Sequence, residues 1–129
     1  MIIAATLATA ILFGGMVLYS FGFAAFLFSA LPAETAGPTL RRAFPHFYSF
    51  VIVSSALAAL AYLGSDRVAA MLLGLVALTT LPTRQVLMPA INRATDEGQN
   101  TRFKWLHGLS VLITLGHIAI AGYVLAVGV

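Results

Sequence analysis

Four side chains are the first candidates for chemistry in this sequence: His46, Arg84, His107 and His117. Each lies in or beside a long apolar segment, and an ionisable residue inside a membrane is by default a candidate functional residue. Histidine titrates near neutral pH, so it can relay a proton, and it can also bind haem or a metal ion. His117 follows His107 by ten residues, which is about 15 Å along a helix. The two histidines therefore cannot bind one metal ion together.

The last apolar segment, residues 103–129, is long enough to cross a bilayer as one helix. At 100° per residue, five of its side chains fall within about one quarter of the helix circumference: Phe103, His107, Ser110, Thr114 and His117. Inside a membrane, polar side chains turn toward protein or water rather than lipid. We therefore expect other helices to pack against this face.

The composition is typical of an integral membrane protein. Of 129 residues, 60% are hydrophobic and 9% are charged, and a soluble domain of this size could not bury so much apolar surface. The absence of cysteine excludes disulfides and thiolate metal sites. The net charge of +3 is small, and the sequence has neither a Gly-rich phosphate loop nor a basic run with interleaved aromatic residues. We expect the lipid bilayer, and not a nucleic acid, as the partner.

The apolar runs predict an all-α integral membrane fold, a four-transmembrane-helix bundle with short loops. Residues 1–129 form a single membrane domain in this prediction. Its spans lie at about 2–31, 46–63, 68–88 and 103–128.

Four prolines modify this prediction. Pro32 and Pro38 are expected to interrupt the helix between the first two spans. Pro45 suits the first turn of span two, where its missing N–H is no loss. Pro82 cannot donate to the carbonyl of Leu78, so we expect a kink or a local loosening in span three.

The positively charged residues indicate the orientation in the cell membrane. The loops at residues 32–45 and 89–102, with their flanking ends, hold six of the seven Lys and Arg residues, and the middle loop holds only Arg67. Short loops rich in Lys and Arg remain in the cytoplasm. We therefore place these two loops in the cytoplasm and both termini on the outer side.

Several polar groups are expected to meet at the cytoplasmic end of the bundle. His46 begins span two, Arg84 lies near the end of span three, and His107 lies near the start of span four. We interpret them as the mouth of a polar cavity, with His117 deeper, near the bilayer midplane. The residues assigned to this cavity are His46, Arg84, Gln85, Asn92, His107, Ser110, Thr114 and His117.

Structural roles are the alternative for the same side chains. His117 could be a neutral imidazole bonded to a hydroxyl on a facing helix, and Arg84 could extend to the lipid headgroups. His46 and His107 could belong to a helix-capping network. The hydroxyls considered for His117 are those of Ser54, Ser55, Thr79 and Thr80.

The sequence contains no convincing catalytic set of residues. All four acidic residues lie in or next to loops, and no Ser lies in a nucleophile motif. Without cysteine, a metal site would need nitrogen and oxygen ligands, with His107 or His117 as the first candidates. The pattern thus favours a protein that is not an enzyme. The cofactor is unknown, and haem or a metal ion stays as an alternative.

Three stretches of the sequence carry a family resemblance. They are Gly14-Gly15-Met16-Val17 with Phe21 and Phe26-Leu27-Phe28; Phe44-Pro45-His46-Phe47; and Pro89-Ala90-Ile91-Asn92 followed by Phe103-Lys104-Trp105-Leu106-His107-Gly108-Leu109-Ser110. Together they resemble the transmembrane protein 205-like family over nearly the whole chain. Thr114 departs from the family pattern, which tends to have Asn near this position. The resemblance implies a four-helix integral membrane domain and a function only in outline.

Three functions are compatible with these observations. The first is a membrane protein that binds or passes a small solute or ion through the polar cavity, as in transport. The second is a haem- or metal-binding redox protein with His107 or His117 as an axial ligand. The third is a non-catalytic subunit or assembly factor of a larger membrane complex. Helix faces rich in Gly and Ala would suit such a complex or a homo-oligomer.

Overall fold

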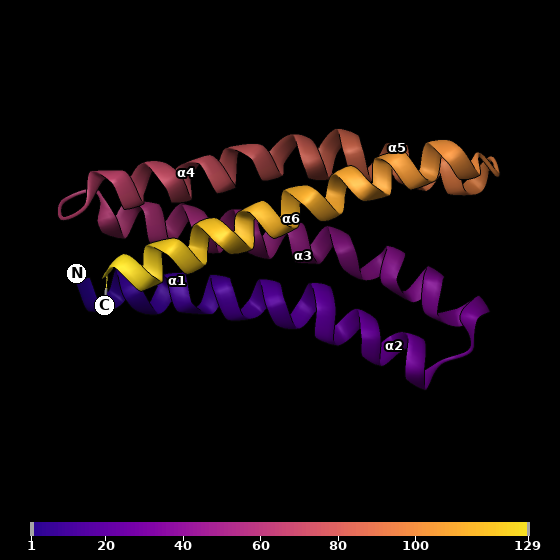
Figure 1. Cartoon of the computed structure of the whole chain (residues 1–129), viewed down its shortest axis with the longest axis horizontal. Coiled ribbons are helices and arrows are strands. Elements are labelled where there is room, and N and C mark those ends of the chain that lie inside the picture. The colour runs from indigo at the N-terminus through magenta and orange to yellow at the C-terminus, as the bar shows by residue number, and fades with distance from the viewer. Residues whose placement is uncertain (1, 129) are drawn as a thin grey trace.

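A computed structural model describes residues 2–128 as four long helical spans that lie side by side (Figure 1). The spans are Ile2–Ala30, Ala33–Tyr62, Arg67–Asp96 and Asn100–Gly128. Each is long and apolar enough to cross a membrane, and the described range contains no strand. The predicted all-α four-helix bundle is confirmed, and the chain is a multi-pass membrane protein. The first span begins and the last span ends at the same end of the bundle (Figure 1).

The first span changes its helical geometry part-way along. It consists of α1 (Ile2–Val17), the π-helical segment η1 (Leu18–Phe23) and α2 (Ala24–Ala30). In η1 the Ser20 hydroxyl donates to the carbonyl of Met16, one turn back. A π turn holds more residues than an α turn, and such segments are frequent at functional sites.

The second span is one continuous helix, α3 (Ala33–Tyr62). The prediction of a loop at residues 32–45 was therefore wrong, as was the expectation that span two begins near residue 46. Pro38 and Pro45 both lie inside α3. Each proline removes one hydrogen bond of the helix, but neither ends it.

Side chains of other spans bind α3 where Pro45 weakens it. The Tyr19 hydroxyl donates to the Ala43 carbonyl at 2.8 Å, and Arg84 Nε donates to the Pro45 carbonyl at 3.2 Å. Pro38 is exposed, so the carbonyl that it leaves unpaired can bind water. The carbonyl that Pro45 leaves unpaired is that of Arg41, so these contacts tie this turn of α3 to the first and third spans without replacing the lost hydrogen bond.

The third span also contains a π-helical segment. It consists of α4 (Arg67–Pro82), η2 (Thr83–Leu87) and α5 (Met88–Asp96). The Asp66 carboxylate caps α4 by accepting from the Ala69 N–H at 3.1 Å. Directly after Pro82, the Met88 N–H donates to the Thr83 carbonyl, five residues back. The loosening expected at Pro82 is therefore confirmed, and the span continues beyond the predicted end at residue 88.

A short turn joins the third span to the fourth. Gly98 has φ of 67°, a left-handed conformation that glycine adopts at little cost. The chain then enters α6 (Asn100–Gly128), which runs back along the bundle.

Close contacts of glycine with aromatic rings help to pack α1 into the bundle. A Cβ at Gly15 would overlap the ring of Phe50 from α3, and a Cβ at Gly122 of α6 would lie 3.1 Å from the ring of Phe13. No atom lies within 4 Å of the Cβ position at Gly14. The described core is otherwise built from Leu12, Met16, Phe47, Val51, Leu73, Val76 and Val124, with several alanines. Large apolar side chains on the outer faces are exposed, as lipid contact requires.

Candidate functional site

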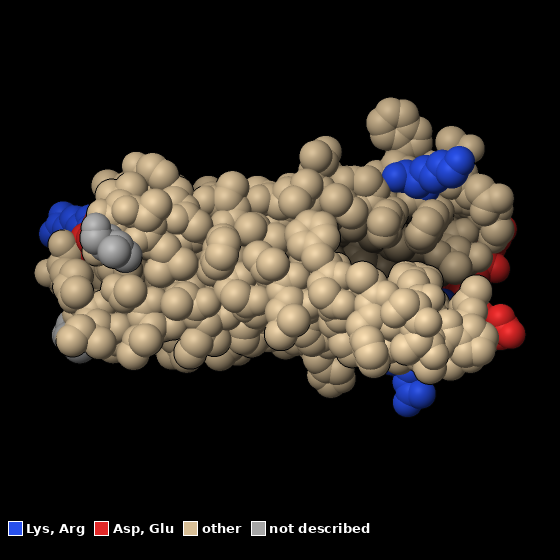
Figure 2. All heavy atoms as spheres, turned by 60° about the horizontal axis from the view of Figure 1, so that its bottom comes forward, with Lys and Arg blue, Asp and Glu red and all other residues tan. Residues whose placement is uncertain are grey.

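A cavity of about 330 Å³ lies between all four spans, toward the end of the bundle that is remote from the chain ends. Figure 2 shows the face of the molecule hollowed near this end. The volume is within the range of small-molecule sites. Polar groups contribute to an otherwise apolar wall; they belong to Ser20, Arg41, Tyr48, Asn92, His107, Ser110 and Thr114. The apolar wall is formed by Phe21, Ala24, Phe28, Leu40, Phe44, Met88, Ile91 and Val111.

Two of the hydroxyls already donate to their own helix. Ser110 Oγ donates to the His107 carbonyl at 2.7 Å, and Ser20 Oγ donates to the Met16 carbonyl. A hydroxyl has one hydrogen and two lone pairs. Both serines therefore offer the cavity acceptors rather than donors.

Tyr48, Asn92, His107 and Thr114 are the polar groups of the cavity that remain available. Within residues 2–128, none of their side chains has a hydrogen-bond partner, and no fully buried side-chain nitrogen or oxygen lacks one. Tyr48 is only 7% exposed and lines the cavity, so its hydroxyl must reach the open space there. The His107 ring stacks on Phe103, with centroids 5.3 Å apart. Four groups that can donate hydrogen bonds thus surround one cavity.

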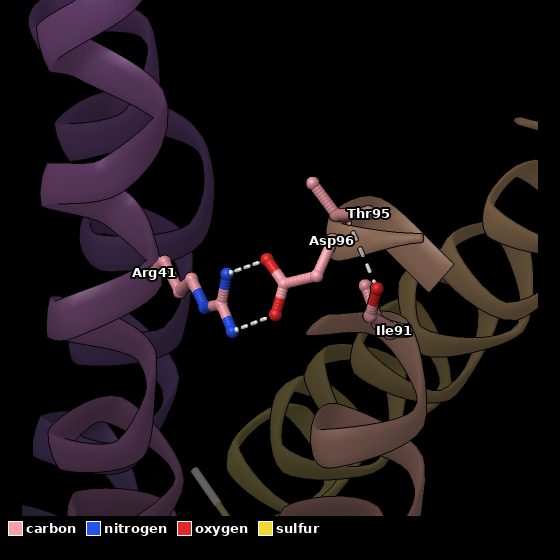
Figure 3. Close-up of polar contacts among 4 residues, drawn as sticks. All are labelled: Arg41, Ile91, Thr95 and Asp96. Atoms are coloured by element: carbon pink, nitrogen blue, oxygen red, sulfur yellow. Dashed lines mark hydrogen bonds and ion pairs between the residues drawn. The ribbon is translucent and has the colours of Figure 1, made fainter. Parts of the chain in front are cut away.

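An ion pair joins two spans at the mouth of the cavity. Nη1 and Nη2 of Arg41 donate to the two carboxylate oxygens of Asp96 at 2.6 and 2.9 Å. Figure 3 shows Arg41 on α3 facing Asp96 at the end of α5, beside Thr95, whose hydroxyl donates to the Ile91 carbonyl at 3.1 Å. Both hydrogen bonds join an ionised donor to an ionised acceptor, so they are stronger than neutral hydrogen bonds. The charge of Arg41 is therefore already compensated by protein.

Four of the predicted cavity residues line the observed cavity, namely Asn92, His107, Ser110 and Thr114. Four others lie elsewhere. Arg84 is held by the Pro45 carbonyl and by Gln85 Oε1, which accepts from Nη1 at 2.8 Å. His46 is exposed on α3 and is not part of the cavity wall. The structure thus assembles the predicted face of span four but not the predicted cluster around Arg84.

His117, the fourth, is buried and bonded to the facing helix. Its Nε2 lies 2.7 Å from Thr79 Oγ1, one of the four hydroxyls expected for the structural role. Thr79 Oγ1 also lies 2.8 Å from the Leu75 carbonyl. Because the hydroxyl has one hydrogen, donation to Leu75 requires that the imidazole donates to Thr79. His117 therefore links α6 to α4.

One comparison decides the family. The model of a family described as a domain of unknown function, DUF4149, matches residues 7–100. The chain belongs to the DUF4149 family. No curated protein and no solved structure matches it. The resemblance to the transmembrane protein 205-like family stays a prediction.

The DUF4149 match ends where α6 begins. It covers the cavity residues that the first three spans contribute, including Ser20, Arg41, Tyr48 and Asn92. His107, Ser110 and Thr114 come from the part of the chain that follows the match. The cavity therefore combines the DUF4149 segment with a helix outside it.

Sequence reasoning missed Ser20, Arg41 and Tyr48 as cavity residues. A usable signal was present for the last two, because Arg41, Phe44 and Tyr48 follow one another at helical spacing and share one face of α3. Ending the helix at the prolines concealed it. For Ser20 the position depends on η1, which nothing in the sequence indicated.

The described residues do not form a metal cluster. Among residues 2–128, no group of three His, Cys, Asp or Glu side chains could share a metal ion. The cavity instead offers hydroxyl, amide and imidazole groups within an apolar wall, which is the chemistry of a site for a small organic molecule.

Proposed function

We propose that this DUF4149 protein binds a small uncharged solute in the cavity between its four spans. Binding alone and passage of that solute through the membrane are both forms of this function. One observation carries the proposal: Tyr48 is only 7% exposed, and its hydroxyl lacks a protein partner and reaches the cavity, where Asn92, His107 and Thr114 also have free polar groups.

Polar groups that are shielded from bulk solvent in a protein are usually paired. Nearly all such groups in proteins are hydrogen-bonded, because an unpaired one costs about 1–3 kcal/mol. Four available groups around one cavity can be paired by water or by a ligand. The aromatic and aliphatic wall gives water few additional partners, whereas an organic molecule would contact the wall and pair the polar groups together. This favours a ligand.

The charge of the solute follows from the wall. Among the described residues that line the cavity, Arg41 carries the positive charge, and both its terminal nitrogens already bind Asp96. An anion would have to compete with that carboxylate. A cation would meet no free carboxylate among the residues of the wall. We therefore infer an uncharged solute.

We also propose that the cavity lies toward the cytoplasm, in the cell membrane. Six of the seven Lys and Arg residues of the sequence belong to the cavity half of the bundle, and Arg67 lies at the other end. Since positive charge favours the cytoplasmic side, both termini would then lie outside.

A cavity-filling variant tests the proposal. Ala24 lines the cavity, and its exposed neighbour Ala25 does not. The probe is 2-naphthol, a flat, fluorescent and neutral molecule with one hydroxyl, titrated into the purified protein in detergent. We expect saturable binding to the wild type and to Ala25→Leu, and a loss of at least about tenfold in affinity in Ala24→Leu, because the added carbons occupy the site. Equal binding by both variants, or no saturable binding at all, would contradict the proposed function.

The haem or metal alternative would be favoured by a different result. A visible absorption band or a stoichiometric metal in the purified protein, lost in His117→Ala or His107→Ala, would move the assignment to a redox protein.

A further inference from the structure

We propose that the ligand of this cavity is a membrane amphiphile that enters sideways from the lipid, between α2 and α6. Its head would be a small, flat and uncharged ring with carbonyl or hydroxyl oxygens, and its apolar tail would leave through the same opening. This inference rests on the proposed function and specifies the class of ligand and its route.

The cavity has an opening where α2 and α6 separate. In Figure 1, α2 diverges from α6 toward the cavity end, and Figure 2 shows the surface hollowed there. The first span contacts α6 through α1, whereas α2 packs on α3. Phe28 of α2 and Val111 of α6 both line the cavity. The cavity therefore opens on the side of the bundle, between the first and last spans.

Exposed apolar side chains surround this opening. Phe26 and Phe28 on the α2 side and Leu112 on the α6 side are all more than half exposed. Outward apolar side chains of a membrane helix contact lipid. Trp105, which is also exposed, is typical of the boundary between lipid and water, and it lies only a few residues before Val111. The opening is thus at the level of the lipid just inside that boundary, so a molecule dissolved in lipid reaches it directly.

The cavity wall indicates the chemistry of the ligand's head group. Aromatic side chains of Phe21, Phe28, Phe44 and Tyr48 form much of the wall, and aromatic rings pack well against a flat ring. The Tyr48 hydroxyl and the Asn92 amide can donate to its oxygens. A phospholipid head is disfavoured, because its phosphate would need a cation and Arg41 is already paired with Asp96. These features together select a neutral ring.

A photoreactive probe tests the route and the orientation. The probe is 2-naphthol with a decyl chain that carries a diazirine near its end, added to the protein in phosphatidylcholine nanodiscs. We expect saturable adducts near Phe28 and Val111, on both sides of the opening. Ala24→Leu should lower these adducts at least about fivefold, while Ala25→Leu keeps them. Adducts on the lipid-exposed Leu78 of α4 should be equal in both variants, because they report lipid alone.

Four results of this experiment support or overturn the inference. Adducts at the opening that are lost only in Ala24→Leu support the inference. The probe could instead form adducts over all the lipid-exposed surfaces, equally in the wild type and in Ala24→Leu, while 2-naphthol without a tail still binds. That result would overturn the inference and leave the proposed function intact. The phosphate ester of decyl-naphthol serves as a charged competitor for the photoreactive probe. If it lowers the adducts as much as uncharged decyl-naphthol does, the assignment of an uncharged head is overturned. Failure of 2-naphthol itself to bind would refute the proposed function instead.

Discussion

Arg41 donates through both terminal nitrogens to both carboxylate oxygens of Asp96, and this pair joins two spans at residues that are 55 positions apart in the chain. Arg41 also lines the cavity, so the pair lies where the second and third spans meet at its mouth. Both side chains are partly exposed. Exposed ion pairs contribute little to stability, and we therefore assign this one a role in holding α3 and α5 in register rather than in holding the fold.

Removing the carboxylate should separate the ends of α3 and α5. Spin labels on cysteines placed at Thr35 and Thr95 report the distance between these ends. We expect Asp96→Asn to broaden the distance distribution or shift it to longer values, because the neutral amide cannot form the two charge-assisted hydrogen bonds with Arg41. The neighbouring Glu97→Gln is the matched control, since Glu97 forms no ion pair in the described residues. Identical distance distributions for the two variants would show that the pair does not set this spacing.

The two adjacent glycines of α1 should differ in their tolerance of a methyl group. A Cβ at residue 15 would overlap the ring of Phe50, whereas no atom lies within 4 Å of the Cβ position at residue 14. We expect Gly15→Ala to destabilise the protein by about 1–3 kcal/mol, as overpacking does. Gly14→Ala should be neutral or slightly stabilising, because alanine favours a helix. Unfolding in detergent measures both, and equal effects would argue against the close contact of α1 with α3.

The contact between His117 and Thr79 should appear as a coupling energy. A double-mutant cycle of His117→Leu and Thr79→Val, measured by unfolding in detergent, should give about 0.5–1.5 kcal/mol, as for other hydrogen bonds between membrane helices. Neither variant should change the affinity for 2-naphthol by more than about twofold, since neither residue lines the cavity. Additive effects on stability would mean that the two side chains do not interact, and lost binding would place His117 in the site.

The orientation can be tested directly, because the natural sequence contains no cysteine. Ser65 and Gln99 are exposed in turns at opposite ends of the bundle. We expect a membrane-impermeant maleimide to label Ser65→Cys on intact cells and Gln99→Cys only after lysis, since positive charge favours the cytoplasmic side. The reverse pattern would place the cavity on the outer side.

Four apolar runs were sufficient to predict the four-helix bundle, because the backbone of a membrane span must satisfy its own hydrogen bonds. The second span was predicted too short, since Pro38 and Pro45 indicate a break when they are considered alone. In the structure, bonds from Tyr19 and Arg84 hold the helix on either side of Pro45. Such contacts from distant residues are not visible in the local sequence.

The site was predicted in part for a related reason. In α6, which is α-helical throughout, a rotation of 100° per residue correctly placed His107, Ser110 and Thr114 on one side of the cavity. Arg84 was assigned to the cavity only from its place near the end of span three, which fixes a residue along the bundle but not the face of the helix on which it lies. In the structure its side chain binds the Pro45 carbonyl and Gln85 instead.

The affinity of Tyr48→Phe for 2-naphthol tests the central claim most directly. Tyr48 and Tyr62 are both buried on α3, but only Tyr48 lines the cavity, so Tyr62→Phe is the control. Removing one hydroxyl that pairs with the ligand should weaken binding about fivefold to tenfold without unfolding the protein. Weaker binding in Tyr48→Phe alone is the result that a ligand site predicts. Wild-type affinity in Tyr48→Phe, or equal losses in both variants, would contradict it.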